Sequence, residues 1–77
     1  MLNRVIEIVA EVMAAPPNAI DESTSSATLE AWDSLRHMNL IVAIEDGFDI
    51  VLDEDAFARL DSVRAIVEEL HRARAAA

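Results

Sequence analysis

The stretch that decides the fold is "EAWDSLRHMNLIVAIEDGFDI", residues 30–50, in which a polar loop gives way to an apolar helical pattern. Asp33 stands where a helix N-cap belongs, because its carboxylate can accept N–H groups of the first turn and complements the positive end of the helix dipole. A helix is therefore predicted from about Ser34 to Asp46. Gly47, the only glycine of the chain, falls where a glycine commonly follows the last turn of a helix.

This predicted helix has more apolar residues than one buried stripe requires. They are Leu35, Met38, Leu40, Ile41, Val42 and Ile44. His37, in the same segment, is expected to lie on the solvated face of the helix.

Apolar residues at three- and four-residue spacing predict a first helix from Leu2 to about Met13, with Asn3 as a candidate cap. The two prolines that follow end this helix, because the residue before a proline is disfavoured in the helical region. Residues 18–33 then form a long loop of mostly turn-forming residues, and a loop of this length in a small domain is often functional. Its few apolar residues are expected to pin it to the core: Ile20, Leu29 and Trp32.

The chain after Gly47 predicts two further helices. A short extended link comes first, in which apolar residues alternate with others: Phe48, Ile50 and Leu52. "DEDAFARL", residues 53–60, predicts a brief helix with Phe57 and Leu60 pointing inward. The last helix is predicted from about Ser62 to Arg74, with its apolar face made by Val63, Ile66, Val67 and Leu70. The expected fold is all-α: a small four-helix bundle of three longer helices and a short third one, with residues 1–77 as a single domain.

The composition excludes several classes of function. The 77 residues include 15 acidic and 6 basic ones, for a formal charge of −9. Such a surface repels phosphate backbones and anionic lipids, so nucleic acid and membranes are not expected as partners, whereas proteins with basic faces are. Cysteine is absent, which removes disulfides, thiolate metal sites and a cysteine nucleophile. The acid-dense stretch "EDGFDIVLDEDAF" does not follow the EF-hand spacing, and no metal site is predicted. Neither a signal peptide nor a membrane-length apolar run is present, so a cytoplasmic monomer is expected.

Three roles are open to Ser34. A serine near a helix N-terminus is commonly a cap, and Asp61-Ser62-Val63 repeats the Asp-Ser-apolar pattern before the last helix. A nucleophile activated by His37 would need an orienting acid and an oxyanion hole, for which the sequence offers no glycine-rich loop. An acceptor serine is the third role, because a phosphate attached at a helix N-terminus lies in the field of the dipole and of free N–H groups.

The stretch "WDSLRHMNLIVAIEDGFDIVLDEDAFARLDSVRAIVEEL" resembles acyl carrier proteins, and the order of elements matches over nearly the whole chain. The resemblance implies that Ser34 receives 4′-phosphopantetheine from coenzyme A, with Asp33 and Leu35 beside it in the motif. The thiol of that arm would then carry an acyl or aminoacyl group as a thioester. Ser62, by the same mapping, is a cap. The chain would not be an enzyme, and its expected partners are a phosphopantetheinyl transferase and an acyl- or aminoacyl-loading ligase or synthase.

The resemblance also implies docking of partner enzymes on the second helix. The candidate docking residues are Arg36, Met38, Val42, Glu45 and Asp46. Arg36, His37 and Asn39 occupy turns where carriers of housekeeping fatty-acid synthesis usually show acids. This departure, and the small size, favour a discrete carrier for a specialised lipid, polyketide or amino-acid-activating pathway. Two alternatives remain: an unmodified carrier-like subunit that docks through its second helix, and a small serine hydrolase.

Overall fold

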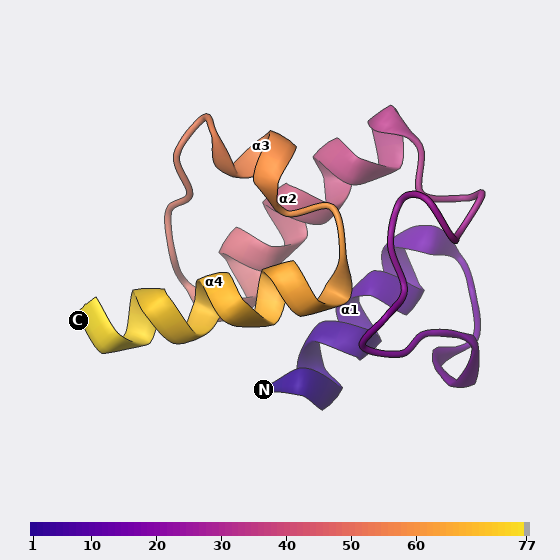
Figure 1. Ribbon diagram of the computed structural model, residues 1–77, viewed down its shortest axis with the longest axis horizontal. Helices are drawn as coiled ribbons and strands as arrows, with labels where there is room; N and C mark the ends of the chain where they lie inside the picture. The colour runs from indigo at the N-terminus through magenta and orange to yellow at the C-terminus, as the bar shows by residue number, and fades with distance from the viewer. Residues whose placement is uncertain (77) are drawn as a thin grey trace.

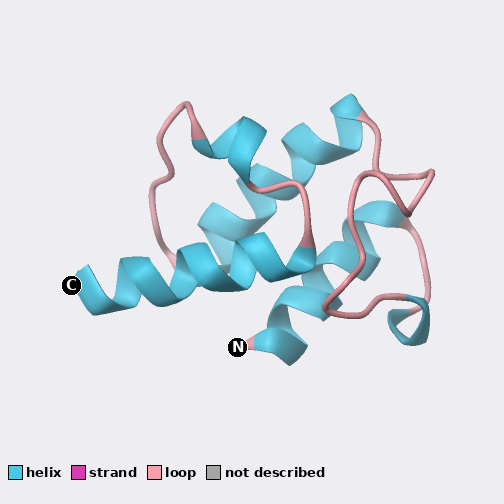
Figure 2. Ribbon diagram, in the orientation of Figure 1, coloured by secondary structure: helices cyan, strands magenta, loops and turns pink. Residues whose placement is uncertain are grey.

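The computed structural model describes the backbone of residues 1–76 and the side chains of residues 1–73. Its elements are α1 (Leu2–Met13), the 3-10 turn η1 (Pro17–Ala19), α2 (Ser34–Phe48), α3 (Ala56–Arg59) and α4 (Val63–Ala76) (Figures 1 and 2). The predicted all-α bundle of three longer helices and a short third one is confirmed. Helix α1 packs against both α2 and α4, and α3 contacts α2. The long loop between α1 and α2 lies at the end of the molecule where α2 begins (Figure 1).

The core is filled by the apolar stripes of the three long helices. Its largest fully buried side chains are Met13, Leu40, Ile44, Leu60, Ile66, Val5, Val9 and Val63. Burying one such side chain stabilises the fold by about 1.5–3 kcal/mol. Ile20 and Trp32 are buried and pin the long loop to this core, as predicted, while Leu29 is half-buried.

Helix α1 begins without the cap that the sequence indicated. Asn3 lies inside the helix and is exposed, and Met1 holds the N-cap position, so the prediction of an Asn3 cap is wrong. The helix ends at Met13 and is followed by Ala14, which adopts the left-handed conformation with φ 56°. The N–H of Ala15 then bonds the carbonyl of Ala10 at 2.9 Å, which satisfies a carbonyl of the last turn.

Helix α2 runs two residues beyond its predicted end. Gly47 lies within the helix, and Asp49, with φ 53°, takes the left-handed position, so the assignment of Gly47 as the residue after the helix is wrong. The glycine has a packing reason instead: a Cβ at position 47 would lie 2.9 Å from Cδ1 of Ile8 on α1. Phe48, expected in the extended link, is the last residue of α2.

The long loop is held to the start of α4 by backbone hydrogen bonds. The N–H of Ser26 bonds the carbonyl of Asp61, and the N–H of Val63 bonds the carbonyl of Thr24, both at 2.9 Å. Within the loop, Asp21 accepts hydrogen bonds from the hydroxyl and the N–H of Ser23, and these bonds lower the pKa of the Asp21 carboxyl. The loop therefore has a defined path beside α4.

Helix α3 is shorter than predicted. Leu60, which follows its last residue, is buried, whereas Phe57 is 40% exposed and does not point fully inward.

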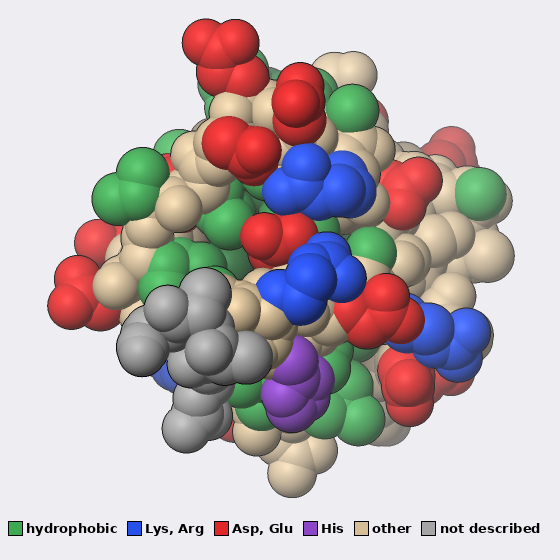
Figure 3. Space-filling view, turned by 60° about the vertical axis from the view of Figure 1, so that its left-hand side comes forward, with side chains coloured by type: hydrophobic (Ala, Val, Ile, Leu, Met, Phe, Trp, Pro, Cys, Tyr) green, Lys and Arg blue, Asp and Glu red, His purple; other side chains and the backbone are tan. Residues whose placement is uncertain are grey.

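The short helix α3 and the last helix α4 are joined by charged side chains. The Arg59 guanidinium pairs with both Asp53 and Glu69 at 3.1 Å. Arg72 also contacts Glu69, at 2.9 Å. Figure 3 shows a face of the molecule on which such basic side chains lie among acidic ones.

Candidate functional site

Ser34 is the first residue of α2 and its side chain is exposed. Asp33 caps the helix as predicted, because its carboxylate accepts the N–H of Arg36 at 2.9 Å. Ser34 therefore presents its hydroxyl at the positive end of a fifteen-residue helix. Ser62, in contrast, uses its hydroxyl to accept the N–H of Ala65 at 3.0 Å, which is the cap role expected of it.

An open hollow of about 300 Å³ lies beside Ser34, which is one of its lining residues. Residues from four segments line it: the long loop, the start of α2, α3, and the turn before α4. They are Ser26, Trp32, Asp33, Ser34, His37, Phe57, Ala58 and Asp61. The hydrogen bond from Ser26 to Asp61 brings the loop to this place.

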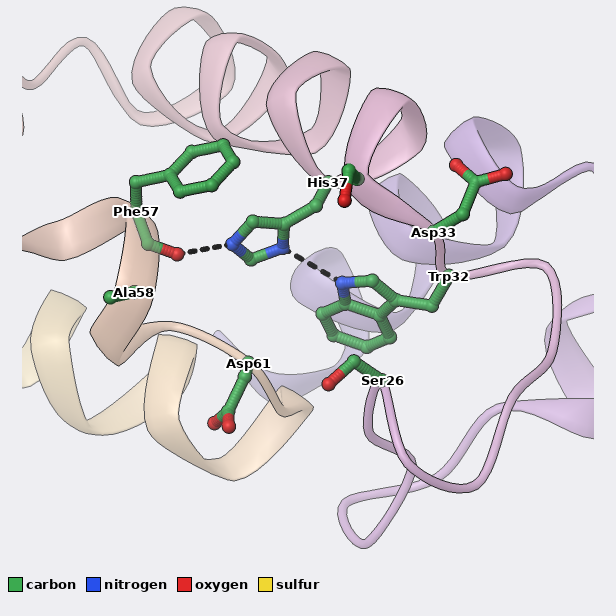
Figure 4. A pocket seen from close by; sticks show the side chains of 8 residues that line it. Ser26, Trp32, Asp33, His37, Phe57, Ala58 and Asp61 are labelled. Carbon is green, nitrogen blue, oxygen red and sulfur yellow. Dashed lines mark hydrogen bonds between the residues drawn. The ribbon is translucent and has the colours of Figure 1, made fainter.

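His37 forms part of the wall of this hollow and is not on the solvated face, so that prediction is wrong. Its side chain is 7% exposed, and it lies between Trp32 and Phe57 (Figure 4). The indole N–H of Trp32 donates to Nδ1 of His37 at 2.8 Å. Because an indole can only donate, Nδ1 must be unprotonated, and the proton of the neutral ring is on Nε2, which donates to the carbonyl of Phe57. Both ring nitrogens thus have partners other than Ser34.

A sequence signal for the burial of His37 existed. Positions 37, 40 and 44 follow the spacing of one helical stripe, and Leu40 and Ile44 are both fully buried. A histidine on this stripe reaches the core, where its two ring nitrogens need partners. Trp32 supplies the first partner and the backbone of α3 the second, and neither contact is readable from spacing alone.

A second apolar stripe of α2 faces solvent. Leu35, Met38 and Val42 are 70%, 56% and 59% exposed. Since residues three and four apart share a helix face, this stripe adjoins Ser34 at one end and the exposed Asp46 at the other. Leu35, beside Ser34 in the motif, therefore faces solvent and not the core.

Two of the candidate docking residues have partners inside the chain. The half-buried Glu45 accepts the backbone N–H of Leu52 at 2.8 Å and so holds the segment after α2. The Arg36 guanidinium donates to the carbonyl of Met13 at 2.6 Å, at the negative end of α1. Arg36 therefore lies on the α1 side of α2, apart from the exposed apolar stripe.

The described part of the chain has neither a metal-binding cluster nor a membrane-length helix. Among its residues no group of three His, Cys, Asp or Glu side chains is placed to hold a metal ion. No helix in it is long and apolar enough to cross a membrane.

Comparison with known proteins agrees with this arrangement. Residues 3–70 match the family described as "Phosphopantetheine attachment site". The chain belongs to the acyl carrier protein family. The acyl carrier protein of Phenylobacterium zucineum is 35% identical over 74 residues, which cover 91% of this chain and 94% of that protein.

Two further relatives are also similar over most of the chain. The acyl carrier protein of Caulobacter vibrioides is 34% identical over 73 residues, covering 90% of this chain and 94% of that protein. Acyl carrier protein 3 of Ralstonia nicotianae is 30% identical over 73 residues, which cover 95% of this chain and 84% of that protein. Membership in this family assigns the chain covalently attached 4′-phosphopantetheine and the function of an acyl carrier, which works with synthases and transferases and is not itself a catalyst.

Proposed function

We propose that Ser34 is the attachment site of 4′-phosphopantetheine and that Asp33 and Leu35 shape its surroundings. The observation that carries this proposal is the exposed Ser34 hydroxyl at the capped start of α2, beside an open hollow. A phosphate linked there lies at a helix N-terminus, which stabilises negative charge. Asp33 fixes the first turn through its bond to the N–H of Arg36, and Leu35 is exposed next to the serine.

The attached group supplies a thiol that holds an acyl or aminoacyl unit as a thioester. For loading, a phosphopantetheinyl transferase with its own divalent metal directs the Ser34 oxygen to the diphosphate of coenzyme A. The P–O bond to the nucleotide half breaks, the bisphosphorylated adenosine leaves, and the serine proton passes to a base of the transferase. The loaded arm then reaches successive docked partners at high effective concentration.

We propose the exposed stripe of α2 as the docking surface for a ligase or synthase. Leu35, Met38 and Val42 offer an apolar centre, and Asp46 adds a negative charge at its far end. A partner with an apolar patch and nearby arginine or lysine residues complements this surface. Glu45, through its bond to Leu52, supports the end of the stripe, and Arg36, bonded to the carbonyl of Met13, adds a positive charge on the α1 side of α2.

The positive charge of Arg36 favours a specialised pathway over housekeeping fatty-acid synthesis. A strongly basic enzyme face that docks at the start of α2 would also approach the Arg36 guanidinium on the α1 side of that helix, and like charges at close approach lower affinity. We place the protein in the cytoplasm, as a monomer with a single carrier domain in residues 1–77, in a specialised lipid, polyketide or amino-acid-activating pathway. An assay of fatty-acid elongation with the loaded protein tests this point: activity equal to that of the host's housekeeping carrier would reject it.

Intact-mass measurement tests the attachment site. The unmodified protein is incubated with coenzyme A, magnesium and a broad-specificity phosphopantetheinyl transferase, alongside Ser34→Ala and Ser62→Ala. We expect one phosphopantetheine increment in the wild type and in Ser62→Ala, and none in Ser34→Ala. Ser62 is a matched control because it also follows an aspartate at the start of a helix, but its hydroxyl is engaged as the cap of α4.

The exposed apolar stripe also favours one alternative function. An unmodified subunit that binds partners through Leu35, Met38 and Val42 would need no arm. A folded wild-type protein that gains no increment in the mass experiment would favour this alternative.

A further inference from the structure

The space between α2 and α3 next to Ser34 is filled by three side chains. Trp32 is 3% exposed and His37 7%, while Phe57 is 40% exposed and its ring meets the imidazole edge-on at a centroid distance of 4.6 Å. We call these three residues the Trp32–His37–Phe57 plug. All three residues line the hollow beside Ser34, and Figure 4 shows His37 between the other two.

The plug is held by hydrogen bonds as well as by packing. The His37 ring accepts from the Trp32 indole at 2.8 Å and donates to the Phe57 carbonyl. Within the described residues, every buried side-chain nitrogen or oxygen has a hydrogen-bond partner. An apolar chain that entered here would separate these groups and leave an indole N–H, an imidazole and a carbonyl without partners, which is costly in a buried place.

We propose that the plug keeps the thioester cargo outside the helical bundle, so that this carrier is built for a short acyl or aminoacyl unit. The proposal rests on the attachment of the arm to Ser34. A long apolar chain left outside would remain in contact with water, which is unfavourable in proportion to its area. An acyl or aminoacyl unit of a few carbon atoms exposes little apolar area to water. The hollow offers it polar groups of Ser26 and Asp61 around an aromatic wall.

The test compares cargo of two lengths on the same protein. The arm is loaded with acetyl or octanoyl groups from the corresponding coenzyme A thioesters, and the mass increment on Ser34 is verified. Cleavage of each thioester by hydroxylamine is then followed by mass spectrometry and normalised to free acetyl- or octanoyl-pantetheine. We expect the normalised rates for the two lengths to agree within about twofold, since neither thioester is sheltered. An octanoyl thioester cleaved about tenfold more slowly, corresponding to a protection of about 1.4 kcal/mol, would overturn the proposal.

Two variants test whether the plug is the cause. In His37→Ala the hydrogen bonds and the ring are lost, and we expect the octanoyl thioester to become protected about tenfold relative to wild type. His71→Ala removes an exposed histidine of α4 and should leave the rates unchanged. A folded His37→Ala protein without added protection would show that the plug is not the barrier. If His37→Ala does not fold, Trp32→Leu takes its place, and the wild-type comparison is decisive in either case.

Failure of this inference is distinguishable from failure of the proposed function. A missing mass increment would reject Ser34 as the attachment site. A protected octanoyl group on a protein with the verified increment would reject only the exclusion of cargo from the bundle.

Discussion

At the scale of single residues, His37 shows how one side chain joins several elements. It stands on α2, accepts a hydrogen bond from the loop residue Trp32 and donates one to the backbone of α3. The sequence indicated that Asp33 caps α2 and that Trp32 is buried, because both depend on neighbouring residues. It did not indicate the partners of His37, because these depend on where α3 lies after folding.

The Trp32–His37 bond predicts a measurable loss of stability in Trp32→Phe. Phenylalanine keeps an aromatic ring but leaves Nδ1 of His37 without a donor in a buried place. We expect the free energy of unfolding to fall by about 1–3 kcal/mol, measured by urea denaturation. Combined with His37→Leu, the two changes should be non-additive by about 1 kcal/mol, and strict additivity would contradict a direct bond.

Ala14 predicts a stabilising substitution. It is exposed and adopts φ 56°, where a Cβ is disfavoured. Ala14→Gly should raise the free energy of unfolding by about 0.5–1 kcal/mol, as measured by chemical denaturation. Ala19→Gly is the matched control, since Ala19 is also exposed but has negative φ, and it should lower the stability by a similar amount.

At the scale of elements, the positions of the helices were predictable and their ends less so. Apolar periodicity placed α1, α2 and α4, because burial of a stripe dictates that spacing. The predicted end of α2 is wrong because Gly47 lies inside the helix, where the lack of a side chain allows close packing against Ile8. The sequence does not show that this glycine meets Ile8. The sequence shows that α2 has more apolar residues than one buried stripe needs. Which of them are buried and which are exposed depends on where α1 packs, and the sequence alone does not show this.

The cap of α4 gives a prediction at this scale. Ser62→Ala removes the acceptor of the Ala65 N–H, and we expect a loss of about 1 kcal/mol in the free energy of unfolding. Thermal and urea denaturation both measure it. Ser62→Asp retains an acceptor and should recover the stability; a Ser62→Ala protein as stable as the wild type would show that the cap is unimportant.

At the scale of the whole molecule, the charge of −9 makes the few basic residues important for cohesion. Arg59 and Arg72 converge on Glu69, and the Arg59–Glu69 pair connects α3 with α4. The pKa of the Glu69 carboxyl lies below its ordinary value of 4.5. The hydrogen bond from the Arg72 guanidinium is the main cause, and Arg59 lowers the pKa further. Asp53 is the main cause of the raised pKa of Arg59.

The lowered pKa of Glu69 predicts a pH-dependent contribution to stability. The contribution is present above the unfolded-state pKa and is lost as pH falls through the lower folded-state pKa. Glu69→Gln should therefore lower the melting midpoint by about 2–5 °C at pH 7, and the difference from wild type should shrink below about pH 4. Glu68→Gln removes the same charge from an exposed position outside this cluster and should not lower the midpoint. If the melting midpoints of wild type and Glu69→Gln differed by the same amount down to pH 3, the stabilisation would not come from the ion pairs of Glu69.

The bond between Trp32 and His37 also makes the chain its own optical probe. The sequence has one tryptophan and no tyrosine, so near-ultraviolet emission excited at the red edge of the indole band comes from Trp32 alone. That indole is buried and its N–H is bonded to an imidazole. Any event that separates the two rings exposes the excited indole to solvent dipoles and shifts its emission to longer wavelength. Opening of the wall beside Ser34 can thus be timed in a stopped-flow spectrometer without a dye.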